Sequence, residues 1–334
     1  MDPITHALAG ATLAWAATGH RVGRRALVVG AAAALLPDID VVIRSAADPL
    51  LAIEHHRGFT HALVTVPFGG ALAALPFTRG LDGRQRGWAV AGGVLAYLSH
   101  PLLDAATTYG TRLFWPFSRY RVGLDVISIV DPIFTLLVLI AAIAAYKARR
   151  TTVLVALALT VVLLAGGYVQ RERATIAQKR VALARGDQLQ RGAVFPTIGN
   201  TLVWRSVYQT GAGALRIDRI RVPWFRRAQY ATVTTEPLVT LEAAGADPNV
   251  RREFARFAWF SDDWLARAPG DPTVIGDARY SLRNDRYDPV WGIRLHPGAT
   301  PPVEWVNRTR NRDVGAAQLW REITGKDPAL LKVP

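Results

Sequence analysis

The chain has no cysteine among its 334 residues, which excludes disulfide bonds, thiolate nucleophiles and cysteine-based zinc sites. Acidic residues are also scarce, since 26 of them are set against 40 basic residues and leave a net charge of +14. Lysine supplies only 4 of the basic residues, so this charge belongs almost entirely to arginine. The arginines are dispersed along the chain and no known nucleic-acid-binding motif accompanies them. We therefore expect no nucleic-acid partner.

Long apolar runs are missing from the second half of the chain. In the first half, uncharged stretches with histidine counted as neutral cover 3–20, 26–37, 58–78, 87–103, 132–146 and 151–170. A helix needs about 20 mostly apolar residues to cross a bilayer, and we expect spans at 4–19, 26–43, 59–78, 87–104, 129–146 and 151–169. The sequence thus predicts a polytopic α-helical membrane domain of about five to six spans over residues 1–170. A small soluble α+β domain over residues 171–334 is expected to follow it.

The charges between the expected spans indicate their orientation. The loops after the first, third and fifth spans hold nine basic residues within about twenty positions, a density typical of cytoplasmic loops. No secretory signal is evident, because an acid, Asp2, precedes the first apolar run and the basic residues follow it. We therefore expect a multi-pass protein of the inner cell membrane, with both termini and the second domain on the extracytoplasmic side.

Histidines and carboxylates gather at the edges of the apolar stretches. Six of the seven histidines lie within the first hundred residues, and three aspartates accompany them. These residues are His6, His20, His55, His56, His61, His100, Asp38, Asp40 and Asp104. Ionisable side chains are costly in or near hydrocarbon and mark functional sites there by default. All of them except His20 fall at one membrane level in the expected topology, which favours a shared metal site.

Local patterns support this interpretation to different degrees. The segment 55–61 places three imidazoles and a guanidinium within seven residues, which packing alone does not explain. His100 and Asp104 are four residues apart, so they share one face of a helix. Pro37 should kink or end the helix that precedes Asp38 and Asp40. The alternatives are that these two acids form only a polar helix end, and that His6 is an interfacial histidine without a ligand role.

Four short motifs occur in a fixed order over about residues 1–150. They are Thr5-His6, Pro37-Asp38-Ile39-Asp40, His56-Arg57-Gly58-Phe59-Thr60-His61 and Ser99-His100-Pro101-Leu102-Leu103-Asp104. This set resembles the YdjM-type inner-membrane metal-dependent hydrolases. The resemblance implies a set of metal ligands, which are His6, Asp38, His56, His61, His100 and Asp104, with Asp40 and His55 as further candidates. The order of ligands is also distantly similar to that of zinc-dependent phospholipase C enzymes, which favours a phosphoester substrate.

Mixed imidazole and carboxylate ligands suit zinc, manganese or iron. We expect a divalent metal, zinc first, as one or two ions, because the candidates outnumber the roughly three protein ligands of a catalytic zinc. A metal lowers the pKa of its bound water to about 7, so activated water would attack a phosphoester or lipid-linked substrate at the outer membrane face. Asp40 is the expected general base or orienting carboxylate. Arg57 is expected to bind an anionic oxygen through its planar guanidinium.

Three functions are compatible with such a cluster. The first is a membrane-bound metal-dependent hydrolase whose partners are membrane lipids or lipid-linked substrates. The second is a transporter, although transporters hold their ionisable residues near the bilayer midplane in broken helices rather than at span ends. The third is a non-catalytic scaffold in which the metal only staples the helices together. An open coordination position separates the first from the third. The sequence does not indicate an oligomeric state.

The second half of the chain has the pattern of a mixed domain. We expect strands at 201–209, 214–222, 230–235, 275–283, 290–296 and 303–308, and helical spacing over 247–267. Seven of the ten tryptophans lie in this half, where most should be core residues. A substrate-binding platform is the alternative role for them.

Overall fold

A computed structural model describes residues 1–281, 283–309 and 315–334. The chain forms two compact units. The first comprises residues 1–43 and 55–168, and the second comprises residues 44–54 and 169–334. The short segment 44–54 therefore packs with the second half of the chain, where Arg256 pairs with Asp48 and Glu54.

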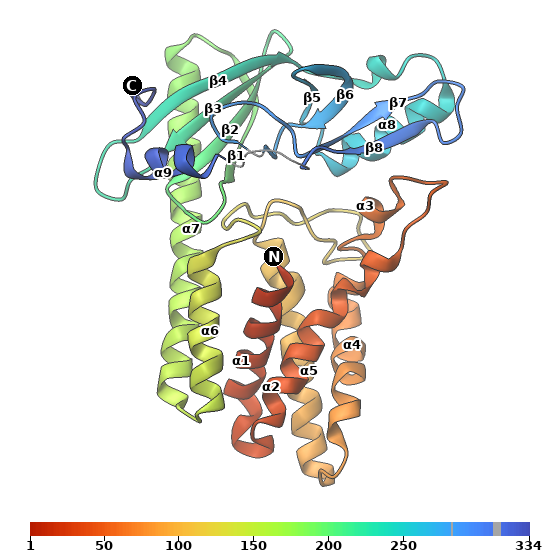
Figure 1. The fold of residues 1–334 in the computed structure, drawn as a ribbon, viewed down its shortest axis with the longest axis vertical. Helices are drawn as coiled ribbons and strands as arrows, with labels where there is room; N and C mark the ends of the chain where they lie inside the picture. Colours follow the sequence, from red (N-terminus) through yellow and green to blue (C-terminus); the bar gives the residue numbers. More distant parts are fainter. Residues whose placement is uncertain (282, 310–314) are drawn as a thin grey trace. The chain divides into compact units, whose positions relative to one another are not determined.

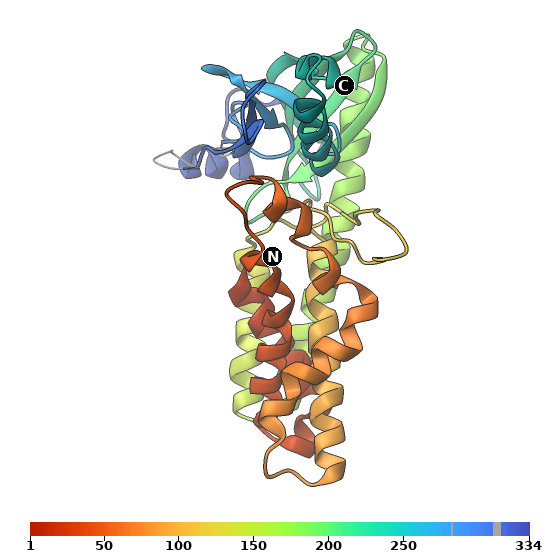
Figure 2. The ribbon, with the colours of Figure 1, turned by 90° about the vertical axis from the view of Figure 1, so that its right-hand side faces the viewer.

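The first unit is helical, and α1, α2, α4, α5 and α6 run alongside one another in both Figure 1 and Figure 2. Its elements are α1 Pro3–Val22, α2 Arg25–Leu35, η1 Leu36–Val42, η2 Phe59–His61, η3 Leu63–Thr65, α4 Val66–Ala74, η4 Leu75–Thr78, α5 Gly83–Ala105 and α6 Pro132–Tyr146. Helix α7, Arg150–Ala184, begins in this unit and continues into the second. Three of these helices have an aspartate as their N-cap, namely Asp2, Asp82 and Asp131. Each carboxylate accepts a hydrogen bond from a backbone N–H in the first turn of its helix.

Small residues allow the helices of the first unit to approach closely. Ala14 of α1, Ala33 of α2 and Ala96 of α5 are fully buried in one cluster with Tyr97. At Gly30 of α2, an added Cβ would lie 2.3 Å from the carbonyl oxygen of Gly10 in α1. The two backbones thus touch where a side chain would otherwise separate them.

The prediction of five to six spans is wrong. Among the described residues, α7 is the one helix that is long and apolar enough to cross a membrane. The number of candidate spans rises to two if the bent pair of helical segments Leu51–His61 and Leu63–Thr78 is taken as a single broken span. An uncharged run is not the same as a continuous apolar helix. Helix α2 stops after 11 residues and becomes the 3-10 turn η1 at Pro37. The pair around residue 62 bends by 52°, and α6 has only 15 residues.

The second unit contains two antiparallel sheets. One has five strands in the order β1-β2-β3-β4-β9, and the other has four in the order β5-β6-β7-β8. The strands are β1 Leu189–Pro196, β2 Val203–Thr210, β3 Ala214–Arg221, β4 Gln229–Pro237, β5 Leu265–Ala268, β6 Asp271–Asp277, β7 Trp291–Leu295, β8 Val303–Asn307 and β9 Leu331–Lys332. The helices and turns are α3 Leu51–His55, η5 Leu241–Ala244, α8 Pro248–Phe260 and α9 Ala316–Thr324.

The core of the second unit lies on both faces of the five-stranded sheet. Ala174 and Ala177 of α7 pack against Trp204 and Ile220 on one face. Val207 and Ile217 belong to a second cluster, which also contains Trp264 beside β5. The strands expected at 201–209, 214–222 and 230–235 correspond to β2, β3 and β4. The expected helix 247–267 ends at Phe260, because the chain turns at Asp262 and Asp263, both with positive φ, and then enters β5.

Candidate metal centre

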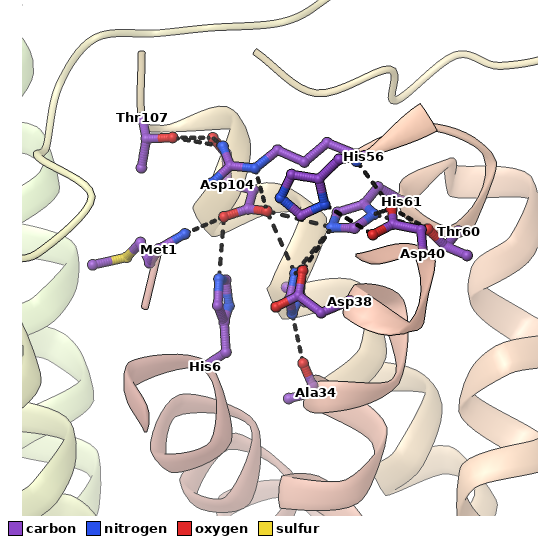
Figure 3. Close-up of polar contacts among 12 residues, drawn as sticks. Met1, His6, Ala34, Asp38, Asp40, His56, Thr60, His61, Asp104 and Thr107 are labelled. Atoms are coloured by element: carbon purple, nitrogen blue, oxygen red, sulfur yellow. Dashed lines mark hydrogen bonds and ion pairs between the residues drawn. The ribbon is translucent and has the colours of Figure 1, made fainter. Parts of the chain in front are cut away.

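Four side chains from three segments converge inside the first unit (Figure 3). Asp38 comes from η1, His61 from η2, and His100 and Asp104 from consecutive turns of α5. One potential ligand atom from each of the four lies within 4.8 Å of the others. The 3-10 turn at Pro37 and the short turn at 59–61 break the neighbouring helices at the level of His100. These breaks bring distant parts of the sequence to one point.

The distances between the donor atoms suit a small tetrahedral ion. His61 Nε2 and His100 Nε2 are 3.0 Å apart. Asp38 Oδ1 lies 3.6 Å from the first nitrogen and 3.4 Å from the second, and Asp104 Oδ2 lies 3.4 Å from both. Four ligands placed about 2.0–2.1 Å from an ion such as Zn²⁺ are separated by about 3.3 Å. The donor set and its spacing therefore fit a divalent cation.

Both histidines are held with Nε2 directed at this point. His100 Nδ1 lies 2.5 Å from the carbonyl oxygen of Ala34, and a carbonyl can only accept. His61 Nδ1 lies 3.0 Å from Thr60 Oγ1 and 3.3 Å from Asp40 Oδ2. With a metal bound, these contacts would hold the ring proton on Nδ1 and leave Nε2 as a lone-pair donor.

Asp104 is the most heavily engaged carboxylate of the centre. It is 1% exposed, and its Oδ2 lies 3.0 Å from Arg57 Nε. Its other oxygen, Oδ1, contacts the amino group of Met1 and lies 3.1 Å from His6 Nε2. Buried charges need such partners, because an isolated carboxylate in a low-dielectric interior is strongly unfavourable.

A second group of possible ligands adjoins the first. It consists of Asp38, Asp40 and His56, so Asp38 belongs to both groups. Asp40 Oδ1 lies 2.8 Å from His56 Nδ1, while Oδ2 accepts hydrogen bonds from the Arg57 backbone N–H and the Thr60 hydroxyl, both at 2.9 Å. Burial acts to raise the pKa of Asp40, but the hydrogen bonds with His56 and His61 outweigh it and hold this pKa below its ordinary value. Asp40 is thus an ionised acceptor shared by two histidines.

Arg57 lies beside the centre in a strained backbone conformation, with φ of 58°. Its Nη1 donates to Thr107 Oγ1 at 2.8 Å and to the Asp104 carbonyl oxygen at 3.2 Å, in addition to the ion pair with Asp104. Its guanidinium carbon lies 4.7 Å from the centre of the Tyr109 ring. Arg57 is therefore fixed in place by groups that surround one of the metal-facing carboxylates.

The remaining predicted residues take different positions. His6 stacks on His100, with ring centroids 3.6 Å apart, but neither group of ligand atoms includes it. Its Nδ1 is buried without a hydrogen-bond partner in the described part of the chain. His55 is in neither group, His20 is exposed, and His296 is partly exposed in the second unit.

Sequence reasoning missed several groups that hold the centre together. Thr60 lies inside the motif at 56–61, and its position between two histidines could have indicated a contact with them. The hydroxyl of Thr107, one turn after Asp104, and the backbone carbonyl of Ala34 carry no recognisable signal in the sequence. Their roles depend on how the segments pack.

Comparison with known proteins identifies the family of this chain. A family model described as YdjM inner membrane protein matches residues 1–174, which include every residue of the candidate centre. The chain belongs to the YdjM family. This membership confirms the resemblance read from the four motifs.

Two of the relatives of this YdjM-family chain illustrate how far the similarity extends. The protein YfhP of Bacillus subtilis (strain 168) is 30% identical over 184 residues, which are 51% of this chain and 54% of that protein. The inner membrane protein YdjM of Escherichia coli (strain K12) is 36% identical over 105 residues, 28% of this chain and 50% of that protein. Each match thus spans about half the length of the relative. No solved structure matches the chain significantly.

Proposed function

We propose that this YdjM-family chain is a membrane-bound, metal-dependent hydrolase that acts on a phosphoester or lipid-linked substrate. The observation that carries the proposal is the set of four donor atoms from Asp38, His61, His100 and Asp104, spaced 3.0–3.6 Å apart across the five measured pairs. Membrane residence is supported by the family description and by the apolar length of α7. Zinc is the first choice of metal, with manganese and iron as alternatives.

The residues of the centre differ in their exposure. His61, His100 and Asp104 are at most 1% exposed, whereas the side chains of Asp38 and His56 are 23% and 27% exposed. A substrate would therefore approach along the edge formed by Asp38 and His56. A bound divalent cation would supply a water ligand with a pKa of about 7.

The residues around this edge have distinct proposed roles. Asp40 holds the rings of His56 and His61 in fixed orientations through their Nδ1 atoms. Arg57 compensates the charge of Asp104 through Nε, and its Nη1 donates to Thr107 and to the Asp104 carbonyl oxygen. The proposed role of the guanidinium is to bind an anionic oxygen of the substrate beside Asp104.

Metal analysis of the detergent-purified chain tests the proposal. We expect wild type to carry at least one divalent ion per chain, His100→Ala to lose it, and the matched control His20→Ala, altered at an exposed histidine, to retain it. Wild type without stoichiometric metal would refute the proposal. A screen against phospholipids and lipid phosphates then addresses the substrate.

Arg57→Ala separates metal binding from turnover. The variant should retain the metal, because Arg57 donates to Asp104 but is not a ligand, and it should lose most hydrolysis of an anionic substrate. Retained turnover would remove the proposed anion-binding role of Arg57.

A non-catalytic, metal-stapled scaffold is the second candidate function. The observation in its favour is that four protein donors can saturate a tetrahedral zinc ion, as they do in structural sites. Cobalt substitution discriminates between the two functions. An absorption spectrum that changes when azide is added indicates an open position, as a hydrolase requires, and an unchanged four-coordinate spectrum supports the scaffold.

The orientation in the membrane belongs to the same proposal. We propose that residues 171–334 are extracytoplasmic, because Lys147, Arg149 and Arg150 directly precede the apolar run of α7 and basic residues favour the cytoplasmic end of a span. Because the chain has no cysteine, a single cysteine at exposed Ala212 can be tested with a membrane-impermeant thiol reagent in intact cells. Labelling only after lysis would place this unit in the cytoplasm.

A further inference from the structure

A groove lined by four arginines lies in the second unit, beside the part of α7 that follows its uncharged run. It has a volume of about 500 Å³ and is lined by Arg173, Ile176, Ala177, Arg180, Val222, Arg226, Arg227, Ala228, Val333 and Pro334. One wall belongs to α7 and the other to the loop 222–228 between β3 and β4. No acidic side chain lines the groove. Among the described residues, none of its four guanidinium groups forms an ion pair with a carboxylate.

The loop is fastened to α7 by hydrogen bonds to its backbone carbonyl oxygens. Gln170 Nε2 donates to the Val222 carbonyl oxygen at 2.6 Å, and Arg173 Nη2 donates to the Pro223 carbonyl oxygen at 2.7 Å. The Arg173 guanidinium carbon also lies 5.8 Å from the centre of the Trp224 ring. These contacts fix the loop beside the helix without neutralising its positive charge.

The tip of the loop exposes two adjacent aromatic side chains. Trp224 is 46% exposed and Phe225 is 99% exposed, and Arg226 and Arg227, also exposed, follow them directly. Aromatic residues next to arginine are typical of the zone between lipid tails and headgroups. A fully exposed phenylalanine has no stabilising contact within the folded chain.

The position along α7 places this loop at the end of a candidate span. The apolar run of α7 ends at Val169, and Arg173 follows four residues later, roughly 6 Å along the helix axis. Arg180 lies two turns beyond Arg173. A helix whose apolar run crosses a bilayer therefore holds the arginine groove at headgroup height.

From these observations we infer that loop 222–228 inserts Trp224 and Phe225 into the membrane interface and that the arginine groove binds the phosphate of an anionic phospholipid. The aromatic side chains supply the apolar contact, and the four arginines supply the charge complementary to a phosphate. This inference does not depend on the metal centre or on hydrolysis.

The full-length chain can be tested with single labels, because it contains no native cysteine. Phe225→Cys carries an environment-sensitive fluorophore, and Ala212→Cys is the matched control at the exposed turn on the other end of β3. In nanodiscs of phosphatidylcholine and phosphatidylglycerol, we expect a blue-shifted emission at position 225 that nitroxide-labelled lipids quench. Position 212 should show neither effect. Identical, unquenched spectra at both positions would overturn the insertion of the loop.

Anionic-lipid binding is measured separately as the phosphatidylglycerol retained by the purified chain, quantified by mass spectrometry. The double variant Arg226→Gln/Arg227→Gln should retain roughly tenfold less. Because both residues are exposed, its metal content and thermal unfolding should match wild type and exclude misfolding. Unchanged retention would overturn the lipid site. Displacement of the lipid by inorganic phosphate, but not by chloride at matched ionic strength, would assign the groove to free phosphate instead.

Discussion

A histidine that binds a metal must keep its coordinating nitrogen free of a proton, and the partner of its other ring nitrogen decides this. In this centre the partner of His100 is a backbone carbonyl, and the partners of His61 are a hydroxyl and the carboxylate of Asp40. Asp40 also holds His56, so one buried acid orients two rings. The main effect of Asp40 should therefore be on metal affinity.

Asp40→Asn tests this role. The amide keeps the size of the side chain but removes its charge and one acceptor oxygen, so His56 and His61 lose a fixed orientation. We expect metal affinity to fall about 10–100-fold, measured by competition with a chelating dye. Asp82→Asn is the matched control, because this exposed residue caps α5 and asparagine is an equally good cap. Equal affinity in the two variants would argue against an orienting role for Asp40.

At the scale of helices and strands, the local sequence predicted the β-strands more accurately than the membrane-spanning helices. Alternation of apolar and polar residues located β2, β3 and β4, because a strand repeats every two residues and its pattern is short. The uncharged runs instead contain Pro37 and the bend near residue 62, which divide them into shorter helices. Those same breaks place Asp38 and His61 beside α5.

Gly30→Leu tests the close contact between α1 and α2. A side chain there must displace the Gly10 carbonyl oxygen, which would lie 2.3 Å from its Cβ. We expect a loss of roughly 3 kcal/mol in stability or failure to fold, measured by thermal unfolding in detergent. Gly87→Leu in α5 is the matched control, since nothing lies within 4 Å of an added Cβ there, and leucine favours the helix. A normal unfolding temperature for Gly30→Leu would contradict the packing described.

At the scale of the whole molecule, the chain divides into two units with different kinds of core. The first unit is helical and contains the whole candidate metal centre, whereas the second is built on two sheets. Seven of the ten tryptophans belong to residues 171–334, and Trp204 and Trp264 are core residues there. Unfolding of the second unit is therefore visible in tryptophan fluorescence.

Removal of the metal should destabilise the first unit selectively. A ligand present at 100 times its Kd stabilises the folded state by about 2.7 kcal/mol, and a chelator abolishes this contribution. We expect a chelator to increase hydrogen exchange in α1, α2 and α5 and to leave exchange in the sheets of the second unit unchanged. His61→Ala should show the faster exchange without a chelator and no further response to it. Equal destabilisation of both units would contradict their independence.

Residue types and their spacing were enough to predict the family, the mixed imidazole and carboxylate chemistry and the strands β2, β3 and β4, because each of these depends on short segments. Only the folded chain decided that ligand atoms of Asp38, His61, His100 and Asp104 lie within 4.8 Å of one another. It also decided that His6 and Arg57 both contact the carboxylate of Asp104. It also decided that most apolar runs form short or bent helices. Contacts between residues far apart in the chain depend on where helices break and how closely their backbones approach, and neither is encoded in a local pattern.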